Sequence, residues 1–403
     1  MIRMATADQA LELILQHGER EVVPAETVPI ALCEGRRLAV PVIAAVSQPP
    51  ADVSAMDGYA VRFTDMKMGA QLSVIGESRA GRPFIAGINP GQAVRIFTGA
   101  HVPLGADHIL IQEDASPDAD KTTVTVTADQ TALSSIRRKG QDFHAGDELV
   151  PAGHVMTAGA IALAAAGNVA SLSVRTPVRI GLLANGDELA EPGSSLQPGQ
   201  VVNSIAPALM TLIRTWGATP VSLGVARDDE ADVRQKIAAA PCDILVTIGG
   251  ASVGDYDVVR NAFAAEGFQP VFEKVAIKPG KPTWFSQRGP QLVLGLPGNP
   301  AAAMVTAHLF LKPLIEVKMD ALSPPHALMT AQTQTELPKT GSREEFLRAV
   351  LTIERDGRAS IRQADDQDSS LLSPFLTANA LIRRRPGSPP AERGALVEVV
   401  WLD

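Results

Sequence analysis

The segment from Cys242 to Asp257, CDILVTIGGASVGDYD, constrains the fold more than any other part of the chain. Its first part, Ile244–Ile248, is a short continuous apolar run, which is typical of a strand buried on both faces of a parallel sheet. Glycines and polar residues follow directly: Gly249, Gly250, Ser252, Gly254, Asp255 and Asp257. Glycines allow a sharp turn whose backbone amides can approach a bound anion. The segment therefore predicts an α/β domain with a ligand site at the end of this strand.

The two aspartates of this segment allow two interpretations. Asp255 and Asp257 could hold a hard cation such as Mg2+, which in turn bridges phosphate oxygens of a ligand. Alternatively, Asp255 caps the next helix and Asp257 lies in its first turn, where the helix dipole favours a carboxylate. The segment alone leaves both interpretations open.

A cationic turn follows the next apolar segment. Val271–Ile277 is predicted to be a strand that contains Lys274 and runs into KPGKP at residues 278–282. Lys278 and Lys281 lie on either side of a Pro-Gly pair, so the loop is stiff and positively charged. Such a loop suits a phosphate or another oxyanion.

A third apolar segment, Leu292–Leu296, is followed by Pro297, Gly298, Asn299 and Pro300. Asn299 is expected as the N-cap and Pro300 as the first residue of a helix that continues through residues 301–315. The positive end of the helix dipole would then face an anionic ligand.

A fourth predicted strand, Val178–Ala184, leads into NGDEL at residues 185–189, which supplies Asp187 and Glu188. Ligands of an open α/β sheet bind outside the carboxyl ends of its strands, so we expect these four loops to line one crevice. Any single loop could be an ordinary turn, because Gly, Pro and Asp are the usual turn residues. Their joint occurrence favours a site.

Composition and charge limit the class of protein. The chain has 403 residues, of which 45% are hydrophobic, and a formal net charge of -8. That charge disfavours nucleic-acid binding, so an anionic ligand must meet local positive loops. Cys33 and Cys242 predict neither a disulfide framework nor a zinc site and favour a reducing cytoplasm. The chain starts with an amphipathic pattern rather than a signal peptide, and Ala158–Ala166 is too short to span a bilayer. We expect a cytoplasmic protein with no membrane association.

Changes in pattern along the chain predict an α/β and β multidomain protein. Short alternating segments separated by turn residues predict an inserted β-rich domain at 47–139. Strands that alternate with helical stretches predict an α/β domain with a mostly parallel sheet at 177–322. The β-prone tail predicts a small C-terminal β-domain at 326–403.

Several motifs, taken together, resemble one known family. They are SAMDGYAV at 54–61, IFTGA at 96–100, RKGQD at 138–142, GDEL at 186–189, GGASVGDYD at 249–257, AIKPGKP at 276–282 and GLPGNPAAA at 295–303. Their order and separations are similar to those of the molybdopterin molybdenumtransferase family, called MoeA in bacteria and represented in animals by the gephyrin E domain. The resemblance implies that the α/β domain binds molybdopterin, and that residues 1–46 and 140–176 form one discontinuous N-terminal domain.

The resemblance implies that molybdenum from molybdate is inserted into adenylylated molybdopterin with release of AMP, which yields the molybdenum cofactor. It also implies Mg2+ as the helper ion, which would neutralise phosphate charge. Catalytic positions of the family match Asp57, Thr98, Asp142, Glu188, Asp228, Asp257, Lys274 and Lys278. Substrate-binding residues are expected at Gly249, Gly250, Ser252, Gly254, Lys281, Pro297, Gly298, Asn299 and Pro300. Metal ligands are expected at Asp187, Glu188, Asp255 and Asp257.

Simpler interpretations exist for several of these residues. Asp57 could be a turn residue before a glycine, Thr98 a strand residue, and Asp142 a solvated loop acid. Asp228 has a neighbour, Asp229, that could be the helix N-cap instead.

The chain departs from the family pattern at three places that bear on a ligand. Asn185 stands where the family usually has Ser or Thr, and Asn203 and Ile205 stand where it often has Asp and Asn. These changes keep a non-catalytic molybdopterin-binding paralogue open as an alternative. A second alternative is an enzyme that resembles molybdopterin adenylyltransferases, which would be related to the α/β domain alone and would leave the N-terminal motifs unexplained. The resemblance further implies a homodimer and contacts with the adenylyltransferase and with downstream cofactor-maturation proteins.

Overall fold

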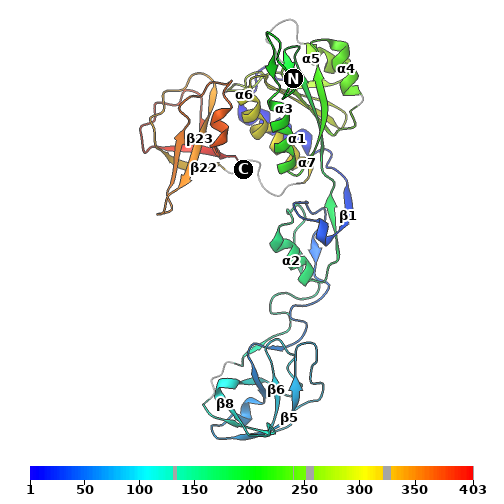
Figure 1. The fold of residues 1–403 in the computed structure, drawn as a ribbon, viewed down its shortest axis with the longest axis vertical. Helices are drawn as coiled ribbons and strands as arrows, with labels where there is room; N and C mark the ends of the chain where they lie inside the picture. Colours follow the sequence, from blue (N-terminus) through cyan, green and yellow to red (C-terminus); the bar gives the residue numbers. More distant parts are fainter. Residues whose placement is uncertain (130–133, 239, 251–257, 321–327, 403) are drawn as a thin grey trace. The chain divides into compact units, whose positions relative to one another are not determined.

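The computed structural model describes residues 1–129, 134–238, 240–250, 258–320 and 328–402. The chain divides into two units, each of which is described by itself (Figure 1). Unit 1 comprises Met1–Glu26, Gly35–Ala39 and Val174–Asp403, and unit 2 comprises Thr27–Glu34 and Val40–Ser173. The predicted first segment, 1–46, is therefore divided between the units, because helix α1 (Ala7–Gly18) buries Ala10 and Ile14 in the core of unit 1.

Unit 1 contains a six-stranded sheet in the order β16-β13-β17-β21-β20-β18. The strands are β13 (Arg179–Asn185), β16 (Thr219–Ala226), β17 (Ile244–Ile248), β18 (Gln269–Phe272), β20 (Trp284–Arg288) and β21 (Gln291–Leu296). β13, β16, β17 and β21 are parallel, while β20 and β18 are antiparallel to their neighbours. The predicted strand at Ile244–Ile248 is confirmed, and all of its residues are buried.

Helices cover both faces of this sheet. One core contains residues of α1, α3 (Ile205–Thr215), α6 (Pro300–Thr306) and α7 (Lys312–Lys318), together with the strand residues Ile180 and Val246. The other contains residues of α4 (Glu230–Ala238) and α5 (Val258–Ala265), with Leu183 and Leu245. Successive strand residues point to opposite faces, so a sheet with two cores requires the continuous apolar runs seen in the sequence.

One predicted strand is wrong. Instead of a single strand at Val271–Ile277, β18 ends at Phe272 and β19 (Ile277–Lys278) begins a separate pairing with the C-terminal region. Between them, the amide of Val275 donates to the carbonyl of Lys281 at 3.1 Å, and the carbonyl of Lys274 accepts from the amide of Ala5 at 2.9 Å. Lys274 thus lies in the connection and not in a strand.

The predicted helix after Asn299 is confirmed and continues to Lys318. It passes from α6 through a π-helical turn at Ala307–Leu311 into α7. By length and composition, Pro300–Lys318 is the one helix among the described residues that could cross a membrane, but 78% of its apolar window is buried inside the protein. It is therefore the core helix of unit 1.

The tail of the chain forms a closed β-barrel within unit 1. Its strands are β22 (Leu328–Thr333), β23 (Glu344–Ile353), β24 (Ala359–Gln363), β25 (Ala380–Arg384) and β26 (Leu396–Trp401). Pairing runs β23-β24-β22-β26-β25, and β25 pairs again with β23, which closes the barrel. β19 pairs in parallel with the N-terminal end of β23, at Glu344 and Glu345. This pairing ties the lysine loop that follows β19 to the barrel.

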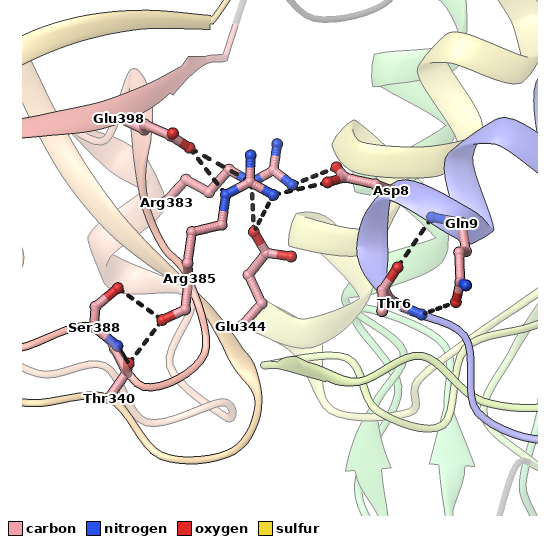
Figure 2. A network of polar contacts seen from close by, with 9 residues as sticks. All are labelled: Thr6, Asp8, Gln9, Thr340, Glu344, Arg383, Arg385, Ser388 and Glu398. Carbon is pink, nitrogen blue, oxygen red and sulfur yellow. Dashed lines mark hydrogen bonds and ion pairs between the residues drawn. The ribbon is translucent and has the colours of Figure 1, made fainter.

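Charged side chains tie helix α1 to the barrel (Figure 2). The guanidinium of Arg383 bonds Glu344 at 2.5 Å and also Asp8 of α1, while Arg385 bonds the other oxygen of Asp8 at 2.7 Å. Glu344 and Arg383 are both buried, so each needs the other to compensate its charge. Burial alone would raise the pKa of Asp8, but the two arginines outweigh it and hold that pKa below its usual value.

Unit 2 holds a six-stranded sheet in the order β7-β4-β6-β5-β9-β8. Its strands are β4 (Gly58–Val61), β5 (Gln71–Ser78), β6 (Gln92–Ile96), β7 (His108–Ile111), β8 (Ala115–Pro117) and β9 (Thr123–Val126). The remaining short elements, of which β1 and β12 extend into unit 1, are β1 (Ala25–Pro29), β2 (Val42–Ile43), β3 (Val53–Ser54), β10 (Ile136–Arg137), β11 (Glu148–Val150), helix α2 (Ala158–Ala166) and β12 (Ser171–Arg175). The predicted β-rich character of this region is confirmed.

Candidate active site

A cleft of about 950 Å³ in unit 1 lies where the loops after four strands meet. It is lined by the following residues predicted from the sequence: Glu188, Gly249, Gly250, Lys278, Lys281, Pro297, Gly298, Asn299 and Pro300. The expectation that these loops line one crevice is confirmed. The short β14–β15 pair (Leu189–Ala190 and Val201–Val202) and residues 203–205, where the chain departs from the family pattern, line the same cleft.

Backbone rather than side chains forms the part of the cleft beside β17. Gly249 and Gly250 have φ of 85° and 69°, which disfavour any residue with a Cβ. A Cβ at Gly249 would lie 2.8 Å from the backbone oxygen of Asn185, and a Cβ on Gly298 would lie 3.4 Å from Gly249 Cα. The backbones of Gly249 and Gly298 thus pass close to each other, and neither residue carries a side chain into the cleft.

The lysine loop supplies positive charge to the cleft. Thr283 holds the turn, because its hydroxyl and amide both donate to the carbonyl of Gly280, at 2.7 and 3.1 Å. Lys278 lies 3.7 Å from Glu345 of β23 as an ion pair, and its side chain is 57% exposed. Since this ion pair is long and partly exposed, Lys278 keeps donor capacity for an anionic ligand.

The C-terminal barrel forms a further wall of the cleft, which the sequence did not predict. It contributes Arg343, Gln367, Asp368, Ser369 and Ser370. The carbonyl of Ser369 accepts from the amide of Ala301 at 2.9 Å, and its hydroxyl accepts from Asn299 Nδ2 at 2.9 Å. Asn299 is thus the N-cap of α6 by position, but its side chain binds the barrel instead of a helix amide.

A buried arginine holds this wall in place. Arg348 of β23 is 1% exposed and donates to the carbonyls of Leu371 at 2.7 Å, Asp368 at 2.9 Å and Asp366 at 3.3 Å. Its backbone amide and Nε donate to Gln367 Oε1, whose amide group returns a bond to the carbonyl of Arg348. These bonds fix the loop that carries Ser369 to α6.

Acidic side chains lie at the ends of β13 and β16. Glu188 lines the cleft, whereas Asp187 and Asp228 do not. Asp228 accepts from Asn185 Nδ2 at 2.6 Å, and its amide donates to Asp187 Oδ1 at 3.3 Å. Within the described ranges, no group of three or more His, Cys, Asp or Glu residues is placed to hold a metal ion.

Three predicted site residues belong to unit 2. Asp57 Oδ1 accepts from the amide of Thr98 at 2.7 Å and from its hydroxyl at 2.8 Å. These bonds, the amide first, lower the pKa of Asp57 and keep it ionised. Asp142 lines a separate cavity of about 600 Å³, together with Gln48, His101, Arg137 and others.

The remaining predictions divide into two groups. Lys274 lies in the connection between β18 and β19 and does not line the cleft. Ser252, Gly254, Asp255 and Asp257 lie outside the described residues. Of the residues that were missed, Arg343 follows a Gly-Ser turn in the sequence, but no local pattern marks residues 366–370 as part of a site.

Three family models match the chain and together cover most of it. Residues 5–167 match the MoeA N-terminal region (domain I and II), residues 181–317 a probable molybdopterin binding domain, and residues 330–402 the MoeA C-terminal region (domain IV).

Curated and solved relatives agree with these matches. The chain is 34% identical over 386 residues to a molybdopterin molybdenumtransferase of Haemophilus influenzae, with 94% of each chain covered. It is 34% identical over 357 residues to a protein of the same name from Nostoc, with 86% of this chain and 81% of that one covered. A crystal structure of a molybdopterin biosynthesis MoeA protein from Pyrococcus horikosii superposes with a TM-score of 0.85 at 25% identity, and the superposition covers 100% of both chains.

Proposed function

Since the chain belongs to the molybdopterin molybdenumtransferase (MoeA) family, we propose that it inserts molybdenum from molybdate into adenylylated molybdopterin and releases AMP. The family is matched in its N-terminal, central and C-terminal regions, so the match extends well beyond the α/β domain. This extent argues against an adenylyltransferase built on the α/β domain alone.

One observation carries the proposal: a single cleft in unit 1 combines a backbone-lined surface, positive side chains and an acid. Lys278, Lys281 and Arg343 supply the positive charge in a chain whose net charge is -8. Both molybdate and the phosphate groups of the substrate are anions, which such groups attract and orient. The N-terminus of α6 adds its dipole at the same place.

The ordered loops explain how these groups stay in position without substrate. Thr283 fixes the lysine turn, β19 ties that turn to β23, and Arg348 holds the Ser369 loop against α6. Groups that are already oriented lose little conformational entropy when the substrate binds. They can therefore stabilise the negative charge that develops on the phosphate during cleavage without first rearranging.

We propose that Glu188, which lines the cleft, and its neighbour Asp187 contribute oxygen ligands to Mg2+. Carboxylate oxygens are the ligands that Mg2+ prefers, and it often takes only one or two of them together with waters and substrate phosphates. When bound, Mg2+ would supply Lewis-acid polarisation of the phosphoanhydride. Asp255 and Asp257 are further proposed ligands from the sequence.

We also propose a cytoplasmic homodimer in which unit 2 of one subunit supplies Asp57, Thr98 and Asp142 to a cleft of the other. The support is the family resemblance, together with an Asp57 carboxylate that two donors hold ionised. Mixing Asp57→Ala and Glu188→Ala chains should restore part of the activity through hybrid dimers. A complete lack of complementation in verified hybrids would contradict the shared site.

The direct test of function is AMP release from adenylylated molybdopterin by the purified protein, with and without molybdate and Mg2+. We expect release that depends on molybdate and that Glu188→Ala strongly reduces. Tight binding of the substrate with no AMP release would instead identify a non-catalytic molybdopterin-binding paralogue.

A further inference from the structure

Asn185 combines deep burial with an unsatisfied polar atom in the wall of the cleft. It is the last residue of β13, it lines the cleft, and it is 4% exposed. Its Oδ1 is buried and accepts no hydrogen bond from any of the residues that the structure describes. An unpaired buried carbonyl destabilises the folded protein, so a residue that keeps one calls for an explanation.

Chemistry fixes the orientation of this side chain. Asn185 Nδ2 lies 2.6 Å from Asp228 Oδ1. An ionised carboxylate only accepts hydrogen bonds, so the NH2 group of Asn185 must face Asp228 and Oδ1 must face away from it. Donation to a carboxylate also polarises the amide and makes Oδ1 a stronger acceptor.

The surroundings of Asn185 favour a flat ligand. The neighbouring wall is the backbone of Gly249 and Gly250, and a Cβ on Gly250 would lie 3.2 Å from Asn185 Nδ2. Gly298 approaches the same backbone, and neither Gly249 nor Gly298 places a side chain between these segments. A planar ring can lie on such a surface, and the N–H groups of a planar heterocycle point outward from its edge.

We propose that Asn185 is a specificity-determining residue of this cleft: Asp228 holds its amide group, and its Oδ1 accepts a hydrogen bond from a ring or exocyclic N–H of the bound heterocycle. The inference rests on the proposed function, because the pterin and the adenine of adenylylated molybdopterin both carry such donors. It assigns a role to the residue that stands where the family usually has Ser or Thr.

The test is the dissociation constant of adenylylated molybdopterin, measured without molybdate for the wild type and for Asn185→Leu. Leucine has the same branching and the same number of side-chain heavy atoms and removes the acceptor, so we expect the dissociation constant to rise about 10-fold or more. The melting temperature of the free variant should be unchanged or higher, because an unpaired buried carbonyl disappears and the exposed Asp228 can bind water instead. Asn185→Thr keeps a side-chain oxygen and should show a smaller loss of affinity.

A matched control is Asn379→Leu, the same substitution at an asparagine of the barrel that does not line the cleft. Its Oδ1 accepts from the amide of Leu351 at 2.7 Å, and its Nδ2 donates to the carbonyl of the same residue at 3.0 Å. Because both ends are paired, this variant should melt at a lower temperature and bind the substrate within about twofold of the wild type.

AMP as a second probe distinguishes the two possible donors. A loss of AMP affinity in Asn185→Leu would place adenine at Oδ1, and a loss seen only with the complete substrate would place the pterin there. The inference is overturned if Asn185→Leu binds the complete substrate like the wild type, or loses affinity only together with a fall in melting temperature like that of Asn379→Leu. A wild type that binds the substrate but never releases AMP would overturn the proposed function and leave this inference standing.

Discussion

The two walls of the cleft in unit 1 are built in different ways. The α/β wall consists of loops that directly follow strands, so Glu188, Gly249 and Pro297 reach the cleft through a few residues of local chain. The barrel wall reaches it through contacts between residues far apart in sequence, such as Arg348 with the loop at 366–371. A strand-end loop can be recognised from its motif, whereas a wall held by a buried side chain becomes visible only in the folded protein.

The strongest test of this difference is Arg348→Met. The substitution leaves buried carbonyls of the 366–371 loop without a donor, and each such group costs about 1–3 kcal/mol. We expect the free energy of unfolding in urea to fall by about 3 kcal/mol, and KM for adenylylated molybdopterin to rise at least about 10-fold, since one wall loses its position.

Arg384→Met is the matched control for that variant. Arg384 lies on the neighbouring strand β25, is 5% exposed, and donates to the carbonyls of Pro338 and Pro389, away from the cleft lining. We expect a comparable loss of stability with KM unchanged. If both variants raise KM equally, the barrel affects the cleft only through general stability and not through the loop.

The lysine turn beside the α/β wall is tested by Lys278→Ala. Lys278 ends β19 just before the turn that Thr283 holds, and its side chain is 57% exposed, so its removal should leave the fold intact and lower kcat/KM about 100-fold through lost anion stabilisation. Steady-state AMP release measures this change, and Lys236→Ala on α4 is the control with the same loss of charge. Similar rates for the two variants would contradict a role for the lysine turn.

The contact between α1 and the barrel should contribute less to the stability of the fold than Arg348 does. Asp8 is 61% exposed on its side chain, so Asp8→Asn should lower the free energy of unfolding by only about 0.5 kcal/mol, and less at high salt. The folded pKa of Asp8 is depressed, so this stabilisation is present above the ordinary value of 3.8 and is lost as pH falls through the folded pKa. Urea titrations of both proteins should therefore differ at neutral pH, and the difference should narrow as the pH is lowered below 3.8.

The smallest effect is expected in unit 2, at the Asp57–Thr98 pair. Thr98→Val removes the hydroxyl donor but keeps the backbone amide, which is the larger cause of the lowered pKa of Asp57. The pKa of Asp57 should therefore rise towards 3.8 without reaching it, as measured by carboxyl NMR titration. A full return to 3.8 would show that the amide bond does not hold in solution.

The fold was predictable where hydrophobic periodicity and turn residues coincide. The strand Ile244–Ile248 and the start of the helix at Pro300 were predicted at their observed positions. The strand predicted at Val271–Ile277 failed because tertiary hydrogen bonds to Ala5 and Lys281 divide it, and no local preference encodes such bonds.

The site, like the fold, was predictable where local sequence motifs mark it and not where contacts between distant residues build it. Motifs at strand ends identified the α/β wall, but the role of Ser369 depends on Arg348 and on the N-terminus of α6. Asn185 was visible only as a departure from a family pattern, and its unpaired carbonyl appears only once Asp228 fixes the amide.

The most direct measurement of the central claim is hydrogen exchange of the backbone amides with and without adenylylated molybdopterin. The account predicts added protection on both walls of the cleft, at Gly249–Gly250 and in the loop at 366–371. Protection confined to one wall, or found only at residues away from the cleft, would contradict the claim that the two walls form one substrate site.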